Sequence, residues 1–455
     1  MRAMRAMVAN DVGRFPTSQL FFMLVVVCSA AAVGLVIAKE KWIAFAAVAV
    51  LLLVIRWPVE VSLGTLALLL PFDSVRLFGG PGEGTAVTYF VAAFTAAVLL
   101  LTGFLQKRFV RPPIAALWWT LFVAWGAASY FWAVDPASVA DRLLTAGSLL
   151  VLFLIAVSIR ITETELHRVA VLCIIGGCAA AIIAARQYGG GLVGVHEQIG
   201  FRETLTMGGD ETNPGQFAST LLLPLSLGIS YLLSWRNWFY RIAMAAAVGV
   251  LSLSLLLTMA RSSLVALLVV VLVFLIRMRA NIRLIVSIGL LASLVFLMPA
   301  LFFERLSTAV ASGGAGRLEI WTVGLASLKQ FGLFGGGLDN FPYVYDLYAS
   351  YAPKYEGMHR GSHNIYLCFA VELGIIGLCL MLAAIWSHFR PLQDFRANRS
   401  RPPAQLIGIE AGCWAMLTAA FFIDVVWRKA FWFDWILLAT AIATLQSARW
   451  RRRKV

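Results

Sequence analysis

The stretch RIAMAAAVGVLSLSLLLTMARSSLVALLVVVLVFLIR, residues 241–277, holds two apolar blocks separated by a few polar residues. Each block has the length of a membrane span, because roughly 20 residues at 1.5 Å rise cross the ~30 Å hydrocarbon core. Only helices and closed barrels satisfy their backbone groups in lipid, and the apolar residues here are continuous rather than alternating. The stretch therefore predicts two transmembrane helices, over residues 242–259 and 263–276.

The same pattern recurs along the whole chain, which is 61% hydrophobic and has a mean hydropathy of +0.84. It predicts an all-α, polytopic integral membrane protein, one domain over residues 1–455, with about 12–14 crossings. Spans 42–55 and 59–70 are short and separated by Pro58, so one broken or re-entrant unit and two separate crossings both stay open. The further candidate spans are residues 20–38, 85–105, 114–134, 143–158, 169–185, 216–234, 282–303, 364–386, 406–426 and 431–445.

The net charge of +14 is spread over short clusters rather than gathered in one basic domain, so we expect no nucleic-acid partner. The clusters lie in alternate loops and at both termini, which the positive-inside rule places in the cytoplasm. The two longest polar segments, residues 187–215 and 304–361, then lie together on the outer face. All six cysteines lie in apolar blocks, where they act as small hydrophobes, and we expect no disulfide.

Arginines also occur on the outer face, against the usual bias of basic residues, and five of them are candidate ligands for an anion. A cation kept on the disfavoured face indicates an anionic ligand there. These residues are Arg186, Arg202, Arg261, Arg317 and Arg360.

Arg261 lies at the end of an apolar block in LLLTMARSSLVALL. One interpretation is a side chain that snorkels to the lipid headgroups. The other is a phosphate clamp, since guanidinium binds phosphate oxygens bidentately and Ser262 or Ser263 adds a hydroxyl donor. Arg186 and Arg202 bracket a glycine-rich loop, and Asn213 leads from that loop into the next span.

A histidine begins a span in GSHNIYLCFAVELGIIG, residues 361–377. If the span is one continuous helix, Gly374 and Gly377 lie about 20° and about 40° from His363 around the axis. They then form a small-residue stripe for helix packing beneath His363. Glu372 points to the opposite face and is not expected to partner the histidine.

Three interpretations of His363 remain open. With Asn364 it can be an interfacial helix cap. It can be a general base, because imidazole titrates near neutral pH. It can also bind a metal with His359, four residues earlier, although no third ligand accompanies the pair and we expect no metal site.

The segment 304–361 predicts an amphipathic helix over residues 317–330, a glycine turn over 335–337 and an aromatic-rich portion after it. Aromatic residues at this position form either an interfacial belt or a surface that binds sugars. The residues concerned are Phe341, Tyr343, Tyr345, Tyr348, Tyr351 and Tyr355.

His363-Asn364 followed by Gly374 and Gly377 resembles the signature of bacterial O-antigen ligases and their polymerase-ligase superfamily. RLEIW and GLFGGGLDNF, the arginine in TMARSS and the segment TNPGQFA are also similar to features of that family. The resemblance covers about residues 187–380. It implies a fold related to class C glycosyltransferases, with a helical periplasmic loop over the active site.

The resemblance further implies a metal-independent, inverting enzyme without cofactors in the bacterial inner membrane. Such an enzyme transfers a glycan from undecaprenyl pyrophosphate to a sugar hydroxyl of lipid A-core at the periplasmic face. His363 is then the general base, and Arg261, Arg202 and Arg186 bind pyrophosphate, supported by Asn364, Arg317, Arg360 and Asn213. An O-antigen polymerase and a protein O-glycosyltransferase are the near alternatives, and a polyprenyl-glycan transporter is the alternative from another class.

Overall fold

The computed structural model describes residues 50, 52–73, 87–191, 206–207, 210–211, 213–235, 237–278, 316–354, 357–397 and 403–453. The expected spans 20–38 and 282–303, most of span 42–55, and Arg202 lie outside these residues.

The described chain is helical apart from one pair of two-residue strands, β1 and β2, which pair antiparallel. The order of elements is η1 (Glu60–Gly64), α4 (Thr65–Leu69), η2 (Leu70–Phe72), α5 (Val87–Leu105), α6 (Ile114–Ala128), η3 (Ser129–Phe131), α7 (Pro136–Val157), α8 (Glu163–Gly191), β1 (Thr206–Met207), β2 (Asp210–Glu211), α9 (Pro214–Ser234), α10 (Trp238–Leu257), α11 (Arg261–Arg277), α14 (Arg317–Phe331), α15 (Phe341–Tyr348), η5 (Ala349–Tyr351), α16 (Ile365–Glu372), α17 (Gly374–Ala397), α18 (Ala404–Ala419) and α19 (Lys429–Arg453).

Eight helices among the described residues are long and apolar enough to cross a membrane. Helices α11 and α18 are also apolar, with 17 and 16 residues. The predicted all-α, multi-pass membrane protein is confirmed. One expected span differs, because residues 364–386 form two helices, α16 and α17, rather than one.

The short spans around Pro58 form one helical run from residue 52 to residue 72, interrupted only at Trp57. The amide of Trp57 donates to Leu53 O at 2.7 Å, and the amide of Val61 donates to Trp57 O at 2.9 Å. Because these bonds carry the helical turn across Pro58, the proline does not separate two units.

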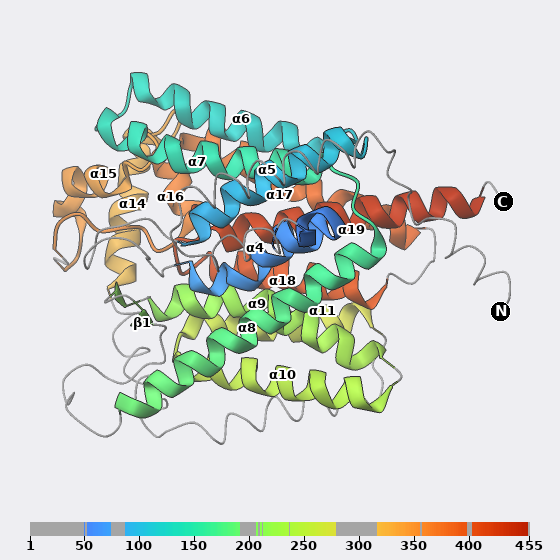
Figure 1. The fold of residues 1–455 in the computed structure, drawn as a ribbon. Helices are drawn as coiled ribbons and strands as arrows, with labels where there is room; N and C mark the ends of the chain where they lie inside the picture. Colours follow the sequence, from blue (N-terminus) through green and yellow to red (C-terminus); the bar gives the residue numbers. More distant parts are fainter. Residues whose placement is uncertain are drawn as a thin grey trace, which may run out of the picture.

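The long helices run along one bundle, and α14, α15 and α16 gather at one end of it, the left end in Figure 1. We call this the α14 end. Several loops that the charge pattern assigns to one face meet at the opposite end: Phe109 bridges Ile159, Gln405 donates to Leu166 O, and Thr444 donates to Ile161 O. Helix α19 runs toward this end, and we call it the α19 end.

Helices α9 and α19 form the centre of the bundle, since their spans are 83% and 78% buried whereas several others reach only 33%. Helix α9 packs antiparallel against α18 through small residues. A Cβ on Gly408 would lie 2.8 Å from Ser230 Oγ, and a Cβ on Gly412 would lie 2.9 Å from Ser226 Oγ. This close approach is typical of membrane helices that present small residues four positions apart.

We expect Gly412→Val to destabilise the protein by about 1–3 kcal/mol, because the added carbons overpack the α9–α18 contact. SDS-induced unfolding of the purified protein in mixed micelles measures this change. Gly249→Val on α10 is the matched control, since a Cβ at Gly249 meets no atom within 4 Å. Equal unfolding curves for the two variants would show that the close contact does not limit stability.

Candidate functional site

Four helices begin close together at the α14 end: α9, α11, α14 and α16. The Cβ position of Gly215 in α9 lies 3.9 Å from Ser262 Oγ in α11 and 3.2 Å from Ile423 in the loop that follows α18. The guanidinium of Arg317 in α14 lies over the ring of Phe422 in the same loop, and Ile365 of α16 donates to Ala420 O. Helix N-termini carry partial positive charge, so their convergence favours an anion.

His363 lies in the turn immediately before α16, with φ of +49°. This left-handed conformation is unfavourable for a residue other than glycine, so the surroundings must hold it in place. Hydrogen bonds fix the residues immediately before and after His363. Trp321 Nε1 donates to Ser362 O at 3.0 Å, and Asn364 caps α16 by accepting from the amides of Tyr366 and Leu367.

Asp424 is the acidic partner of His363. Its Oδ2 lies 3.8 Å from His363 Nδ1, and both side chains are 45% exposed. Ser362 Oγ donates to the other carboxylate oxygen at 3.1 Å. Burial raises the pKa of Asp424, whereas His363, Ser362 and Arg317 act in the opposite direction. The pair is therefore a histidine within ion-pair distance of a carboxylate and open to a ligand.

Sequence reasoning missed Asp424. The available signal was an aspartate in FFIDVVWRK, between two apolar blocks and on the same predicted face as His363. Its loop is fixed by α9, because Gln216 Nε2 donates to Asp424 O at 3.4 Å while Arg428 donates to Gln216 Oε1 at 2.7 Å.

Arg261 and Arg317 supply the positive charge of the site. Each is the first residue of its helix, α11 or α14, and each is half-buried. Burial lowers the pKa of Arg317, the nearby Arg261 lowers it further, and Asp424 opposes both. Neither guanidinium has a carboxylate within ion-pair distance among the described residues. Two adjacent arginines without a neutralising carboxylate form a site for an anion.

The structure brings together some of the sequence-predicted site residues and leaves others apart. His363, Asn364, Arg261, Arg317 and Asn213 meet at the four helix starts; Asn213 caps α9 by accepting from Gly215 N at 2.9 Å. Arg186 has no described contact with this cluster. Arg186 is exposed near the end of α8, and Arg360 is exposed and folded back toward Gly357.

The expected glycine stripe beneath His363 is wrong, because α16 ends at Glu372 and the helix is broken before α17. Gly374 has φ of +66°, and a Cβ there would lie 2.2 Å from Leu333 O. Gly374 therefore packs against the glycine turn that follows α14 rather than against a neighbouring helix. A Cβ on Gly377 would lie 2.2 Å from Leu373 Cβ, so the break between α16 and α17 also needs a residue without a side chain at this position.

The glycine turn satisfies the backbone groups that the break exposes. Gly336 N donates to Val371 O and Gly337 N donates to Glu372 O, at 2.9 and 2.8 Å. The buried carboxylate of Glu372 accepts from Phe341 N at 3.2 Å. Glu372 thus anchors the segment after α14 and is not a partner of His363, as the sequence predicted.

His359 and His363 do not lie on one helix, contrary to the geometry that a two-histidine metal site requires. Both precede α16 in left-handed conformations. His359 Nδ1 lies 2.5 Å from Asp346 Oδ2, whereas His363 faces Asp424. Within the described ranges, no group of three or more His, Cys, Asp or Glu side chains is placed to hold a metal.

The aromatic residues after the glycine turn divide into two groups. Phe341 and Tyr345 are buried in a small core with Ile320 and Val323, so they do not form a sugar-binding surface. Tyr343 and Tyr351 remain accessible, and Tyr343 packs edge-on against His359.

Comparison with known protein families gives a match within the chain. Residues 245–382 match the family model described as O-Antigen ligase, which covers less than a third of the chain. No curated protein matches the sequence. The matched segment contains Arg261, Arg317 and His363, whereas Asp424 and Gln216 lie outside it.

We expect Gly374→Ala to lower the midpoint of thermal unfolding by several degrees, because the added Cβ is strained at positive φ and collides with Leu333 O. Differential scanning fluorimetry in detergent measures the midpoint. Gly147→Ala on α7 is the control, since a Cβ at that position meets no atom within 4 Å. An unchanged midpoint in Gly374→Ala would contradict the role of this glycine at the helix break.

Proposed function

We propose that this multi-pass membrane protein is an O-antigen ligase, on the premise that residues 245–382 match the family model described as O-Antigen ligase. It takes a glycan from undecaprenyl pyrophosphate and attaches it to a sugar hydroxyl of lipid A-core. We place the reaction at the periplasmic face of the bacterial inner membrane, with both termini cytoplasmic.

The observation that carries this proposal is a histidine–carboxylate pair beside two arginines without a neutralising carboxylate. His363 and Asp424 supply the base. Arg261, Arg317 and the starts of α9, α11, α14 and α16 supply an anion site next to it. Transfer from a pyrophosphate lipid to a hydroxyl needs these two functions together.

His363 acts on the acceptor. Asp424 aligns the ring through Nδ1, which leaves Nε2 to take the proton of the acceptor hydroxyl. The 3.8 Å separation from Asp424 is longer than a hydrogen bond, and such contacts often tighten when substrate binds. The deprotonated oxygen attacks the anomeric carbon of the donor glycan, and a single displacement inverts that centre.

The two arginines act on the donor. As the new bond forms, the bond between the anomeric carbon and the pyrophosphate oxygen breaks, and its electron pair stays on the leaving oxygen. Arg261 and Arg317 stabilise the charge that develops there. Because pyrophosphate is already a good leaving group, electrostatic stabilisation can stand in for a general acid.

The position of the site suits two substrates that are both anchored in the membrane. His363 precedes α16 and Arg261 begins α11, so the reacting groups meet at the ends of membrane helices, near headgroup depth. The helix α14 and the glycine turn after it cover this end of the bundle.

A cell-free assay with purified protein, polyprenyl-pyrophosphate-linked glycan and lipid A-core, in chelator and without nucleotide, tests the proposal. We expect glycan on lipid A-core. His363→Ala should reduce turnover by at least ~10²-fold through loss of the base, and Asp424→Asn should reduce it less. Asp346→Asn, which removes the partner of His359, should leave turnover unchanged.

A different product in this assay would identify one of the alternative functions. Longer polyprenyl-linked chains would indicate a polymerase, and glycan on protein would indicate a protein O-glycosyltransferase. Glycan movement across vesicles without any transfer would indicate a transporter.

Arg261→Lys and Arg317→Lys should each lower turnover by about 10²-fold, because lysine keeps the charge but loses the bidentate geometry. Initial rates at saturating donor measure the loss. Arg108→Lys, at the α19 end and paired with Glu165, is the control. Near-normal rates in Arg261→Lys would return this residue to the snorkelling interpretation.

A further inference from the structure

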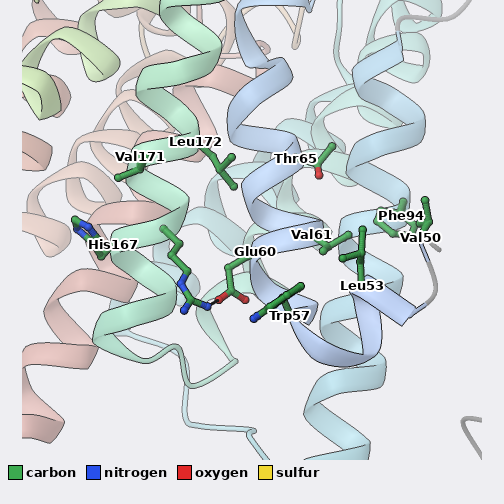
Figure 2. Close-up of a pocket in the computed structure, with 11 residues that line it drawn as sticks. Val50, Leu53, Trp57, Glu60, Val61, Thr65, Phe94, His167, Val171 and Leu172 are labelled. Atoms are coloured by element: carbon green, nitrogen blue, oxygen red, sulfur yellow. Dashed lines mark hydrogen bonds and ion pairs between the residues drawn. The ribbon is translucent and has the colours of Figure 1, made fainter. Parts of the chain in front are cut away.

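A cavity of about 850 Å³ lies between the helical run of residues 52–72, α5 and α8 (Figure 2), and His363 is not among its lining residues. Its lining is mostly apolar, with a few polar side chains. The lining residues are Val50, Leu53, Trp57, Glu60, Val61, Thr65, Phe94, His167, Arg168, Val171 and Leu172.

Two of the helical segments that border the cavity, α4 and α8, touch closely at one level. A Cβ on Gly64 would lie 2.5 Å from Leu172 Cδ1, and a Cβ on Gly176 would lie 2.2 Å from Leu68 O, so α4 and α8 are in close contact there. One turn nearer the α19 end, the facing residues are Glu60 and Arg168. These two side chains form an ion pair, and η1 is wound as a π-helix at this point. Such π-turns occur frequently at functional sites.

Glu60 and Arg168 form an ion pair that is incompletely satisfied. Arg168 NH1 donates to Glu60 Oε1 at 2.7 Å. The other carboxylate oxygen, Oε2, is buried and has no hydrogen-bond partner among the described residues. The Glu60 side chain is only 10% exposed, whereas that of Arg168 is 50% exposed. An orphaned buried carboxylate oxygen is costly, so this site favours a ligand that donates a hydrogen bond.

The position of the pair indicates the kind of ligand. Arg168 comes five residues after the start of α8, which places it about 7.5 Å along the helix, at the depth of lipid headgroups. Beyond it, the rim residues Val50, Leu53, Trp57 and Phe94 remain 38–47% exposed within the described chain. A membrane protein presents such an apolar rim to acyl chains.

We propose that this cavity binds a phospholipid whose headgroup carries a primary ammonium next to its phosphate. The ammonium donates to the carboxylate of Glu60, the phosphate accepts from the exposed face of Arg168, and an acyl chain follows the apolar lining. The ammonium of the headgroup pairs with the Glu60 carboxylate, and the adjacent phosphate pairs with the Arg168 guanidinium. A headgroup that lacks the cation, or whose cation has no N–H donor, therefore fits less well. This site is independent of the transfer reaction proposed at the α14 end.

Native mass spectrometry of the delipidated protein with phosphatidylethanolamine, phosphatidylcholine or phosphatidylglycerol tests the headgroup. We expect one molecule of phosphatidylethanolamine to be retained roughly tenfold better than either other lipid, as one charge-assisted hydrogen bond predicts. Phosphatidylcholine has the charge without an N–H, and phosphatidylglycerol has no cation. Equal retention of all three would overturn the proposal.

Variants locate the binding. Glu60→Gln should abolish the preference for phosphatidylethanolamine, and Thr65→Phe, which fills the cavity, should remove the bound lipid altogether. Glu163→Gln at the start of α8 removes a carboxylate outside the cavity and should change nothing. Retained selectivity in both cavity variants would place the lipid elsewhere and overturn the proposal.

A photoreactive residue in place of Leu53 identifies the occupant without disturbing the ion pair. Irradiation in phosphatidylethanolamine vesicles should give an adduct with the mass of the lipid. A cross-link to another part of this chain, or to a second copy, would show that protein fills the cavity and would overturn the proposal.

Discussion

The close contact between α9 and α18 is the constraint on which the geometry of the site depends. Gly408 and Gly412 face Ser226 and Ser230, so the two backbones approach closely. In lipid, helices gain little from hydrophobic burial against one another, and such close packing is what fixes their register. That register brings the start of α9 to the end of α18. Gln216 then reaches the backbone of Asp424, and Gly215 packs against Ile423.

The second element of the site is the break between α16 and α17. Backbone groups freed within a membrane helix must find other partners, because water is absent there. The glycine turn after α14 supplies them through the amides of Gly336 and Gly337. The glycine turn thereby links α14 to α16. Trp321 of α14 also donates a hydrogen bond to the backbone oxygen of Ser362. His363 is therefore positioned by two helices rather than by its own helix alone.

The two arginines of the site lack the carboxylate partners that several other described arginines have. Arg108, Arg142, Arg168 and Arg277 each bind a carboxylate within the protein. Arg261 and Arg317 do not, although both are half-buried and close to each other. Two cations held together in this way favour an anion, and Asp424 only partly balances them because it also faces His363. In the proposed reaction, this arrangement would place a charged leaving group beside a base.

Much of this protein follows from its sequence alone. Continuous apolar blocks determine transmembrane helices, the alternating basic loops predict which loops share one end, and the helical pattern after residue 316 predicts α14 within one residue of its observed end. His363, Arg261, Arg317, Asn213 and Asn364 were all recognisable as candidate site residues. These features are local, since they depend on hydrophobicity, charge and spacing within one segment.

Only the tertiary structure decided which residues contact one another at the site. It selected Asp424, which lies 61 residues after His363 in a loop with no motif of its own, and it left Arg186 exposed near the end of α8. It also replaced the expected glycine stripe with a broken helix, because positive φ at Gly374 becomes favourable only when another segment satisfies the exposed backbone. Contacts between distant segments depend on how helices pack in three dimensions, and periodicity within one segment carries no information about them.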